Sequence, residues 1–105
     1  MLFRSTEGPA GPAAPTSVVA QAVASTQVNL SWTASTTNGV TYNVYRSTTA
    51  GFTPAPGNLL TNISATTYTD SSVVASTTYY YIVEAVDAYG SSVASAQALD
   101  RKSVV

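Results

Sequence analysis

A long β-strand is predicted by the stretch Thr77-Thr78-Tyr79-Tyr80-Tyr81-Ile82-Val83-Glu84-Ala85-Val86-Asp87. Its residues alternate between two sets, and one set is apolar or aromatic throughout: Tyr79, Tyr81, Val83 and Ala85. Alternation with a period of two is the pattern of a strand that buries one face, and aromatic and β-branched side chains suit that surface. We therefore expect one row of side chains in a core and the other row outside.

Shorter runs of the same kind precede and follow this stretch, separated by turn residues such as Asn38-Gly39. The predicted strands cover residues 18–22, 27–33, 41–47, 59–60, 66–70, 77–87 and 92–98. No helix is predicted, and residues that favour long helices, such as Leu, Glu, Lys and Met, are rare. Short strands with frequent turns are typical of an antiparallel sandwich or barrel.

The inward rows of these strands supply a predicted hydrophobic core around the single tryptophan of the chain. Its members are Val28, Leu30, Trp32, Tyr42, Val44, Tyr79, Tyr81 and Val83. A chain of 105 residues is enough for one domain with a core of moderate size.

The two ends of the chain differ in composition from its middle. Residues 1–14 hold the run Gly8-Pro9-Ala10-Gly11-Pro12-Ala13-Ala14, which is typical of a linker or disordered leader. We expect the folded domain to cover residues 15–99 and residues 100–105 to form a C-terminal tail.

The order and spacing of the segments resemble those of a fibronectin type III domain. The segments that carry the resemblance are Pro15-Thr16-Ser17-Val18, Val28-Asn29-Leu30-Ser31-Trp32, Tyr42-Asn43-Val44-Tyr45-Arg46, Tyr68-Thr69-Asp70, and the long stretch from Thr77 with the later Gly90. The resemblance implies an all-β, seven-stranded antiparallel immunoglobulin-like β-sandwich. It also implies that Tyr79 is the tyrosine-corner residue, whose hydroxyl bonds to backbone upstream. In one departure, Ala75-Ser76 replaces the family's usual Pro-Gly before the corner.

The Ser/Thr/Ala-rich composition is similar to that of fibronectin type III modules in secreted bacterial enzymes that degrade polysaccharides. That similarity implies a non-catalytic accessory module, a spacer or linker in a larger secreted protein, with the neighbouring domains as its partners. A monomer is expected.

The titratable residues are few, and this excludes most kinds of catalytic and metal-binding site. There is no His and no Cys, so the commonest general base, nucleophilic thiol and metal ligands are missing. We interpret the acids of the folded part, Asp70, Glu84 and Asp87, as solvated surface groups. No catalytic residue, cofactor or metal site is therefore predicted. A net charge of −1 without a basic cluster argues against nucleic acid and anionic membrane partners.

One alternative function depends on aromatic residues expected to point outward. Tyr45, Tyr80 and Ile82 fall on the outer rows of two strands that pair directly in the family's topology. As an exposed patch they would form a weak binding site for a polysaccharide or a protein. The other interpretation is a cross-strand tyrosine pair that stabilises the sheet by roughly 0.2–1 kcal/mol. The sequence leaves both open.

Overall fold

The computed structural model describes residues 12–87, 90–91 and 98–99, and within them the chain forms two antiparallel sheets. The first sheet has the order β2-β3-β6 and consists of β2 (Thr16–Ala24), β3 (Gln27–Thr33) and β6 (Thr67–Asp70). The second has the order β5-β4-β7-β8 and consists of β4 (Thr41–Ser47), β5 (Leu59–Ile63), β7 (Tyr80–Asp87) and β8 (Gly90–Ser91), with β9 (Ala98–Leu99) also paired to β7. The predicted all-β sandwich is confirmed.

Two short strands, β8 and β9, follow β7 in the described part of the chain. β8 pairs with the end of β7 at Val86 and Asp87, and β9 pairs with its start at Tyr80 and Tyr81. Most of the predicted strand at 92–98 lies outside the described residues, as do most of the predicted leader and all of the predicted tail.

Several predicted bounds differ from the structure. β2 covers Thr16–Ala24 where residues 18–22 are predicted, and β6 begins at Thr67 and not at residue 66. β7 begins at Tyr80 and not at Thr77, because its pairing partner β4 ends at Ser47, which is opposite Tyr80. The strand predicted at residues 59–60 extends to Ile63. The expectation of no helix is wrong for one turn of 3₁₀ helix at Pro56–Asn58, where proline occupies the first helical position and its fixed φ suits the turn.

The core lies between the two sheets and contains every residue predicted for it. Burial in β3 alternates strictly, as a half-buried strand requires. The cluster also includes Val73 and Ala85. At its centre the rings of Trp32 and Tyr42 meet edge to face, with centroids 5.6 Å apart. Such a pair adds about 0.5–1.5 kcal/mol beyond the burial of its surface.

The chain enters the sandwich at the end where β3 finishes. Thr16, the first residue of β2, pairs with Thr33, the last residue of β3. Just after β3, the backbone N–H of Ser35 donates to the hydroxyl of Tyr42, which places the start of β4 at the same end. We call this end the first pole.

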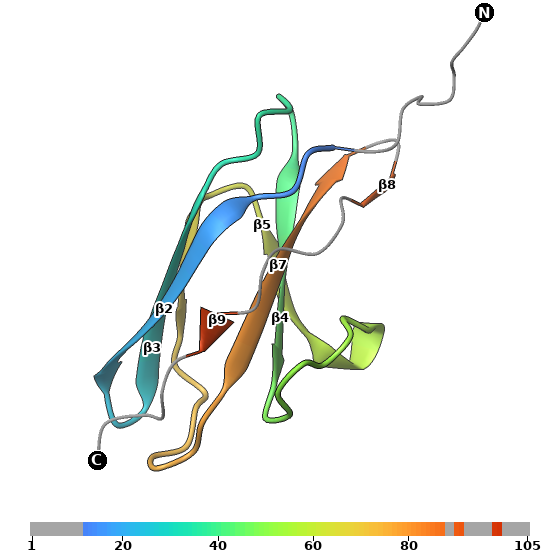
Figure 1. The fold of residues 1–105 in the computed structure, drawn as a ribbon. Coiled ribbons are helices and arrows are strands. Elements are labelled where there is room, and N and C mark those ends of the chain that lie inside the picture. The colour runs from blue at the N-terminus through green and yellow to red at the C-terminus, as the bar shows by residue number, and fades with distance from the viewer. Residues whose placement is uncertain (1–11, 88–89, 92–97, 100–105) are drawn as a thin grey trace, which may run out of the picture.

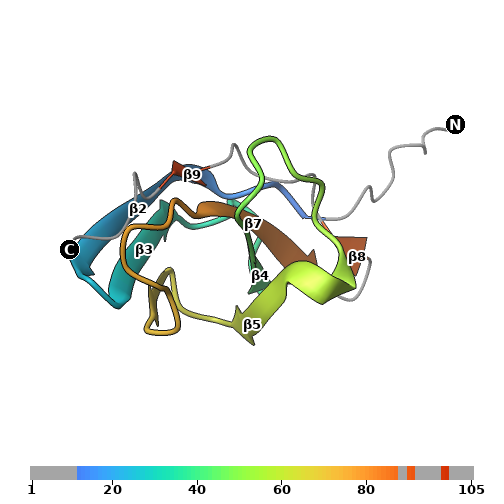
Figure 2. The ribbon, with the colours of Figure 1, turned by 90° about the horizontal axis from the view of Figure 1, so that it is seen from below.

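The described chain leaves at the opposite end. β7 begins there, and Leu99 of β9 pairs with Tyr80, the first residue of β7. We call this end the second pole. Figure 1 shows β2 starting near the upper end of the molecule and β9 lying nearer the lower end. Seen from below in Figure 2, β2 and β3 lie to one side and β4, β5 and β7 to the other.

Ordered contacts begin before Pro15. Pro12 is buried, and the backbone N–H of Ala13 donates to Thr37 Oγ1 at 3.0 Å. The N–H of Thr37 in turn donates to Ser35 Oγ at 3.0 Å. The segment that precedes β2 is therefore attached to the loop between β3 and β4 at the first pole.

Candidate functional site

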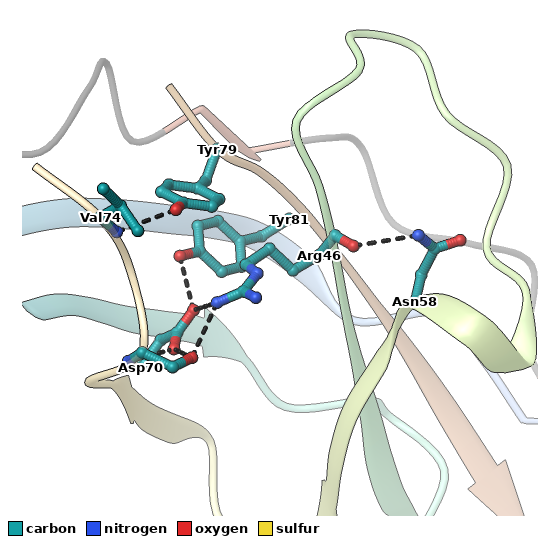
Figure 3. A network of polar contacts seen from close by, with 7 residues as sticks. Arg46, Asn58, Asp70, Val74, Tyr79 and Tyr81 are labelled. Carbon is teal, nitrogen blue, oxygen red and sulfur yellow. Dashed lines mark hydrogen bonds and ion pairs between the residues drawn. The ribbon is translucent and has the colours of Figure 1, made fainter. Parts of the chain in front are cut away.

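A buried carboxylate lies at the junction of the two sheets. Asp70 ends β6, and only 1% of its surface is exposed. The interpretation of Asp70 as a solvated acid is therefore wrong. It is the only buried charged residue in the part of the chain that the structure describes. Figure 3 shows the polar network around it.

Four hydrogen bonds satisfy this carboxylate. Oδ2 accepts from Arg46 Nη1 and from the hydroxyl of Tyr81, each at 2.9 Å. Oδ1 accepts from the backbone N–H of Ser72 at 3.1 Å and from its hydroxyl at 2.7 Å. Arg46 and Tyr81 belong to the second sheet, so the network joins the two sheets through one side chain (Figure 3).

The protonation state of Asp70 follows from these contacts. Burial raises the pKa of its carboxyl, but the hydrogen bonds from Ser72, Arg46 and Tyr81 outweigh burial and hold the pKa below its ordinary value. The group is ionised at neutral pH. Since its oxygens are already engaged by four donors, it is a weak proton acceptor, and this arrangement has the chemistry of a structural tie and not of a general base.

A second set of contacts fixes the chain on either side of this network. The guanidinium carbon of Arg46 lies 4.9 Å from the ring centroid of Tyr79, a cation–π geometry. The hydroxyl of Tyr79 accepts a hydrogen bond of 2.9 Å from the backbone N–H of Val74, five residues upstream. The predicted tyrosine corner is thus confirmed. Asn58 Nδ2 donates to the carbonyl oxygen of Arg46 at 3.2 Å.

Sequence reasoning missed this network although one signal for it was present. Arg46 follows Tyr42 and Val44 at intervals of two, so the alternation of β4 places it on the face that those core residues share. A charged residue on a core face needs a buried partner of opposite charge. Asp70 was the nearest candidate at a strand end.

The predicted patch of Tyr45, Tyr80 and Ile82 is only partly as expected. Tyr45 pairs with Ile82 across β4 and β7, while Tyr80 pairs with Ser47, so the three side chains share one outer face. The expected exposure is wrong for two of them, because Tyr45 is 8% exposed and Ile82 is 5% exposed. Tyr80 is half-buried. Binding by this patch stays a prediction.

The hydroxyl of Tyr45 is engaged on that face. It donates to Glu84 Oε1 at 3.0 Å and accepts from Asn43 Nδ2 at 3.2 Å. Burial raises the pKa of the Tyr45 hydroxyl, and the neighbouring carboxylate of Glu84 adds to the rise. Asn62 of β5 extends the row through a 2.7 Å bond to Asn43 Oδ1. These polar side chains on the outer face of the second sheet therefore satisfy one another's hydrogen bonds.

The outer face of the first sheet is hollowed. A groove of about 370 Å³ lies over β2, β3 and β6. Its outward side chains are uncharged: Val19, Gln21, Asn29, Ser31, Thr67 and Thr69. Each of them is exposed. This groove was not predicted, because it depends on the pairing of three strands that are far apart in sequence.

The described residues were compared with the requirements of a metal site and of a membrane-spanning helix. Across residues 12–87, 90–91 and 98–99, no three of the acidic, His or Cys side chains gather as metal ligands would. The same residues include no helix with the length and apolar character of a membrane span.

Comparison with known proteins agrees with this geometry. The family model described as "Fibronectin type III domain" matches residues 13–100. Chitinase A1 of Niallia circulans is 40% identical over 87% of this chain, and poly(3-hydroxybutyrate) depolymerase of Ralstonia pickettii is 44% identical over 76%. Exoglucanase B of Cellulomonas fimi is 40% identical over 84%. The matched regions are 12%, 14% and 7% of those proteins, so the chain spans a small part of each.

Solved structures give the same result. A crystal structure of an Fn3-like protein from Clostridium thermocellum superposes with a TM-score of 0.73 and 36% identity, over 86% of this chain and 92% of that one. A crystal structure of titin domains gives a TM-score of 0.70 with 27% identity, over 84% of this chain and 30% of that one.

Proposed function

Because this chain belongs to the fibronectin type III family, we propose that it is a non-catalytic spacer module in a larger, secreted bacterial enzyme that degrades a polymer, most plainly a polysaccharide. The observation that carries the proposal is the small share of each relative that the chain matches, between 7% and 14% in a chitinase, an exoglucanase and a depolymerase. A module of this size within an enzyme leaves the chemistry to the remainder of the protein.

The direction of the chain supports a spacing role. The polypeptide enters at the first pole and leaves the described region at the second, so the sandwich separates whatever is attached at its two ends. The segment before β2 is held to the loop after β3 through Ala13 and Thr37. A neighbouring domain joined there would be attached to a folded surface and not to a free chain.

The chemistry of the site supports a non-catalytic role. The buried carboxylate of Asp70 accepts four internal hydrogen bonds. The chain contains no His or Cys. Hydrolysis by carboxylates alone needs two acidic side chains that face each other across a substrate cleft, and Asp70 is buried and already engaged by internal donors.

A distance measurement tests the spacing role. The full chain is placed between two fluorescent proteins, and the distance distribution is measured by single-molecule energy transfer. The control carries a Gly/Ser linker of the same length, for which a broad distribution around roughly 50–60 Å is expected. We expect one narrow distribution for the folded chain, which broadens in denaturant. A distribution as broad as that of the Gly/Ser control in native buffer would contradict the spacer role.

A further inference from the structure

We propose that the groove on the outer face of β2, β3 and β6 binds a neutral polysaccharide chain through side-chain amides and hydroxyls. The site lies on the sheet opposite the aromatic patch suggested by the sequence. This inference goes beyond the spacer role and does not depend on it. The groove volume of about 370 Å³ falls within the roughly 300–1,000 Å³ of typical ligand sites.

Strand register arranges the groove as two parallel rows that cross all three strands. In one row Ser31 of β3 pairs with Val19 of β2 and with Thr67 of β6. In the other, Asn29 pairs with Gln21 and with Thr69. Neighbours within a row are about 4.8 Å apart, and the rows are separated by two residues, or about 6.7 Å. The result is a regular grid of polar groups that suits an extended, repetitive ligand.

The polar groups in the groove match the hydroxyls of a sugar. Thr69 Oγ1 donates to Asn29 Oδ1 at 3.0 Å and so fixes the orientation of that carboxamide. Within the described part of the chain, the Asn29 amide nitrogen has no hydrogen-bond partner and is free to donate to a ligand. Carboxamides and hydroxyls both donate and accept, as do sugar hydroxyls. The exposed side chain of Val19, 53% accessible, offers an apolar contact at the edge.

Charge decides between classes of polymer. None of the side chains that line the groove is charged. A nucleic acid or another polyanion needs Lys or Arg to neutralise its backbone. A protein partner of standard size would bury exposed aromatic and apolar anchors. Of the apolar and aromatic side chains that line the groove, Val19 is exposed, Tyr68 is half-buried and Leu30 is buried. An uncharged, hydroxyl-rich chain is the ligand class that these groups satisfy.

Two matched double variants test the proposal. Gln21→Glu with Thr67→Val alters one residue in each row of the groove. Gln27→Glu with Thr33→Val makes the same chemical changes at exposed positions of β3 that share the outer face but do not line the groove. The two variants therefore have the same composition and net charge. Circular dichroism and urea unfolding establish that both are folded.

The full chain is assayed on insoluble chitin and cellulose and by affinity electrophoresis in gels that contain glycol chitin or hydroxyethyl cellulose. We expect the parent chain to be retained by at least one of these neutral polymers. The groove variant should bind at least tenfold more weakly, and the control variant should stay within twofold of the parent.

Three outcomes would overturn the proposal: no retention on any neutral polysaccharide, an equal loss in both variants, or retention only on heparin, DNA or polyester granules. The same variants in the energy-transfer assay keep the two proposals separate. A groove variant that loses binding but keeps the narrow distance distribution affects the binding site and leaves the spacer role unchanged.

Discussion

The hydroxyl of Tyr81 donates a hydrogen bond of 2.9 Å to the buried carboxylate of Asp70, and this bond joins β7 of one sheet to the last residue of β6 in the other. Most contacts between the sheets are apolar and non-directional. This bond, together with that from Arg46, is directional, so it fixes how the two sheets face each other.

Replacement of Tyr81 by Phe should destabilise the domain by about 1.5–3 kcal/mol, because a hydrogen bond to a buried charge is lost. Urea unfolding measures the change. Tyr68→Phe is the matched control, since the Tyr68 hydroxyl makes no hydrogen bond to the residues that the structure describes, and it should change stability by less than about 0.5 kcal/mol. Equal effects in the two variants would contradict the role of the bond.

Removal of the Tyr79 hydroxyl should lower the free energy of unfolding by less than removal of the Tyr81 hydroxyl does. In Tyr79→Phe the backbone N–H of Val74 loses its acceptor, but the Val74 side chain is 63% exposed and water can reach this turn. We expect a loss of about 0.5–1.5 kcal/mol, the net value of an ordinary hydrogen bond. A loss larger than that of Tyr81→Phe would show that the corner, and not the buried network, is the stronger tie.

Acid should weaken the domain through Asp70. Its pKa in the folded state is lowered below the value of about 3.9 in an unfolded chain. The stabilisation that comes from this difference is therefore fully present above about pH 4 and is lost as the pH falls through the folded-state pKa. Urea unfolding between pH 2 and pH 7 measures it. Asp70→Asn should be less stable at pH 7 and should lose part of this acid dependence. An unchanged pH profile in Asp70→Asn would contradict the assignment.

Ser76→Gly should stabilise the domain. Ser76 has a φ of 62°, a left-handed conformation that costs a residue with a side chain about 1–2 kcal/mol. Glycine removes that cost, but it also gives the unfolded chain more conformational entropy, which lowers the free energy of unfolding by about 0.4–1 kcal/mol. The expected net gain is about 0.5–1 kcal/mol, seen as a higher urea midpoint. Ser64→Gly, at an exposed position without a positive φ, should lower the midpoint.

The tryptophan offers a test of the core. Trp32→Ala should cost roughly 3–5 kcal/mol as a large-to-small change. Trp32→Phe should cost clearly less, because Nε1 of Trp32 is buried without a hydrogen-bond partner among the described residues and no bond is lost with it. Thermal melting compares the two. Equal melting points for Trp32→Ala and the parent chain would contradict the core assignment.

The face on which a residue lies was predictable from sequence, but its exposure was not. Alternation placed Trp32 and Tyr79 in the core and Tyr45 on the outer face, where the structure has them. Tyr45 is nevertheless buried, and its hydroxyl bonds to Glu84 on the neighbouring strand β7 and to Asn43 on its own strand. A periodic pattern describes one strand, whereas burial on an outer face depends on the strands beside it.

Contacts between strands that are distant in the chain also could not be predicted from the sequence. Alternation in β4 places Arg46 on the core face, but its partner Asp70 is 24 residues away in the other sheet, so local spacing does not identify the pair. The groove has the same origin, since its rows exist only in the register of β2, β3 and β6. The replacement of Pro-Gly by Ala75-Ser76 was visible in the sequence, but the positive φ that Ser76 adopts at that turn was not predicted from it.

Because the chain is attached at opposite poles, a pull on its two ends acts along the strands. The ladder between β2 and β3 is then loaded in shear, and its hydrogen bonds must break together and not one after another as a zipper opens. Force passed between two domains joined at these ends would therefore meet the β2–β3 ladder along its strands.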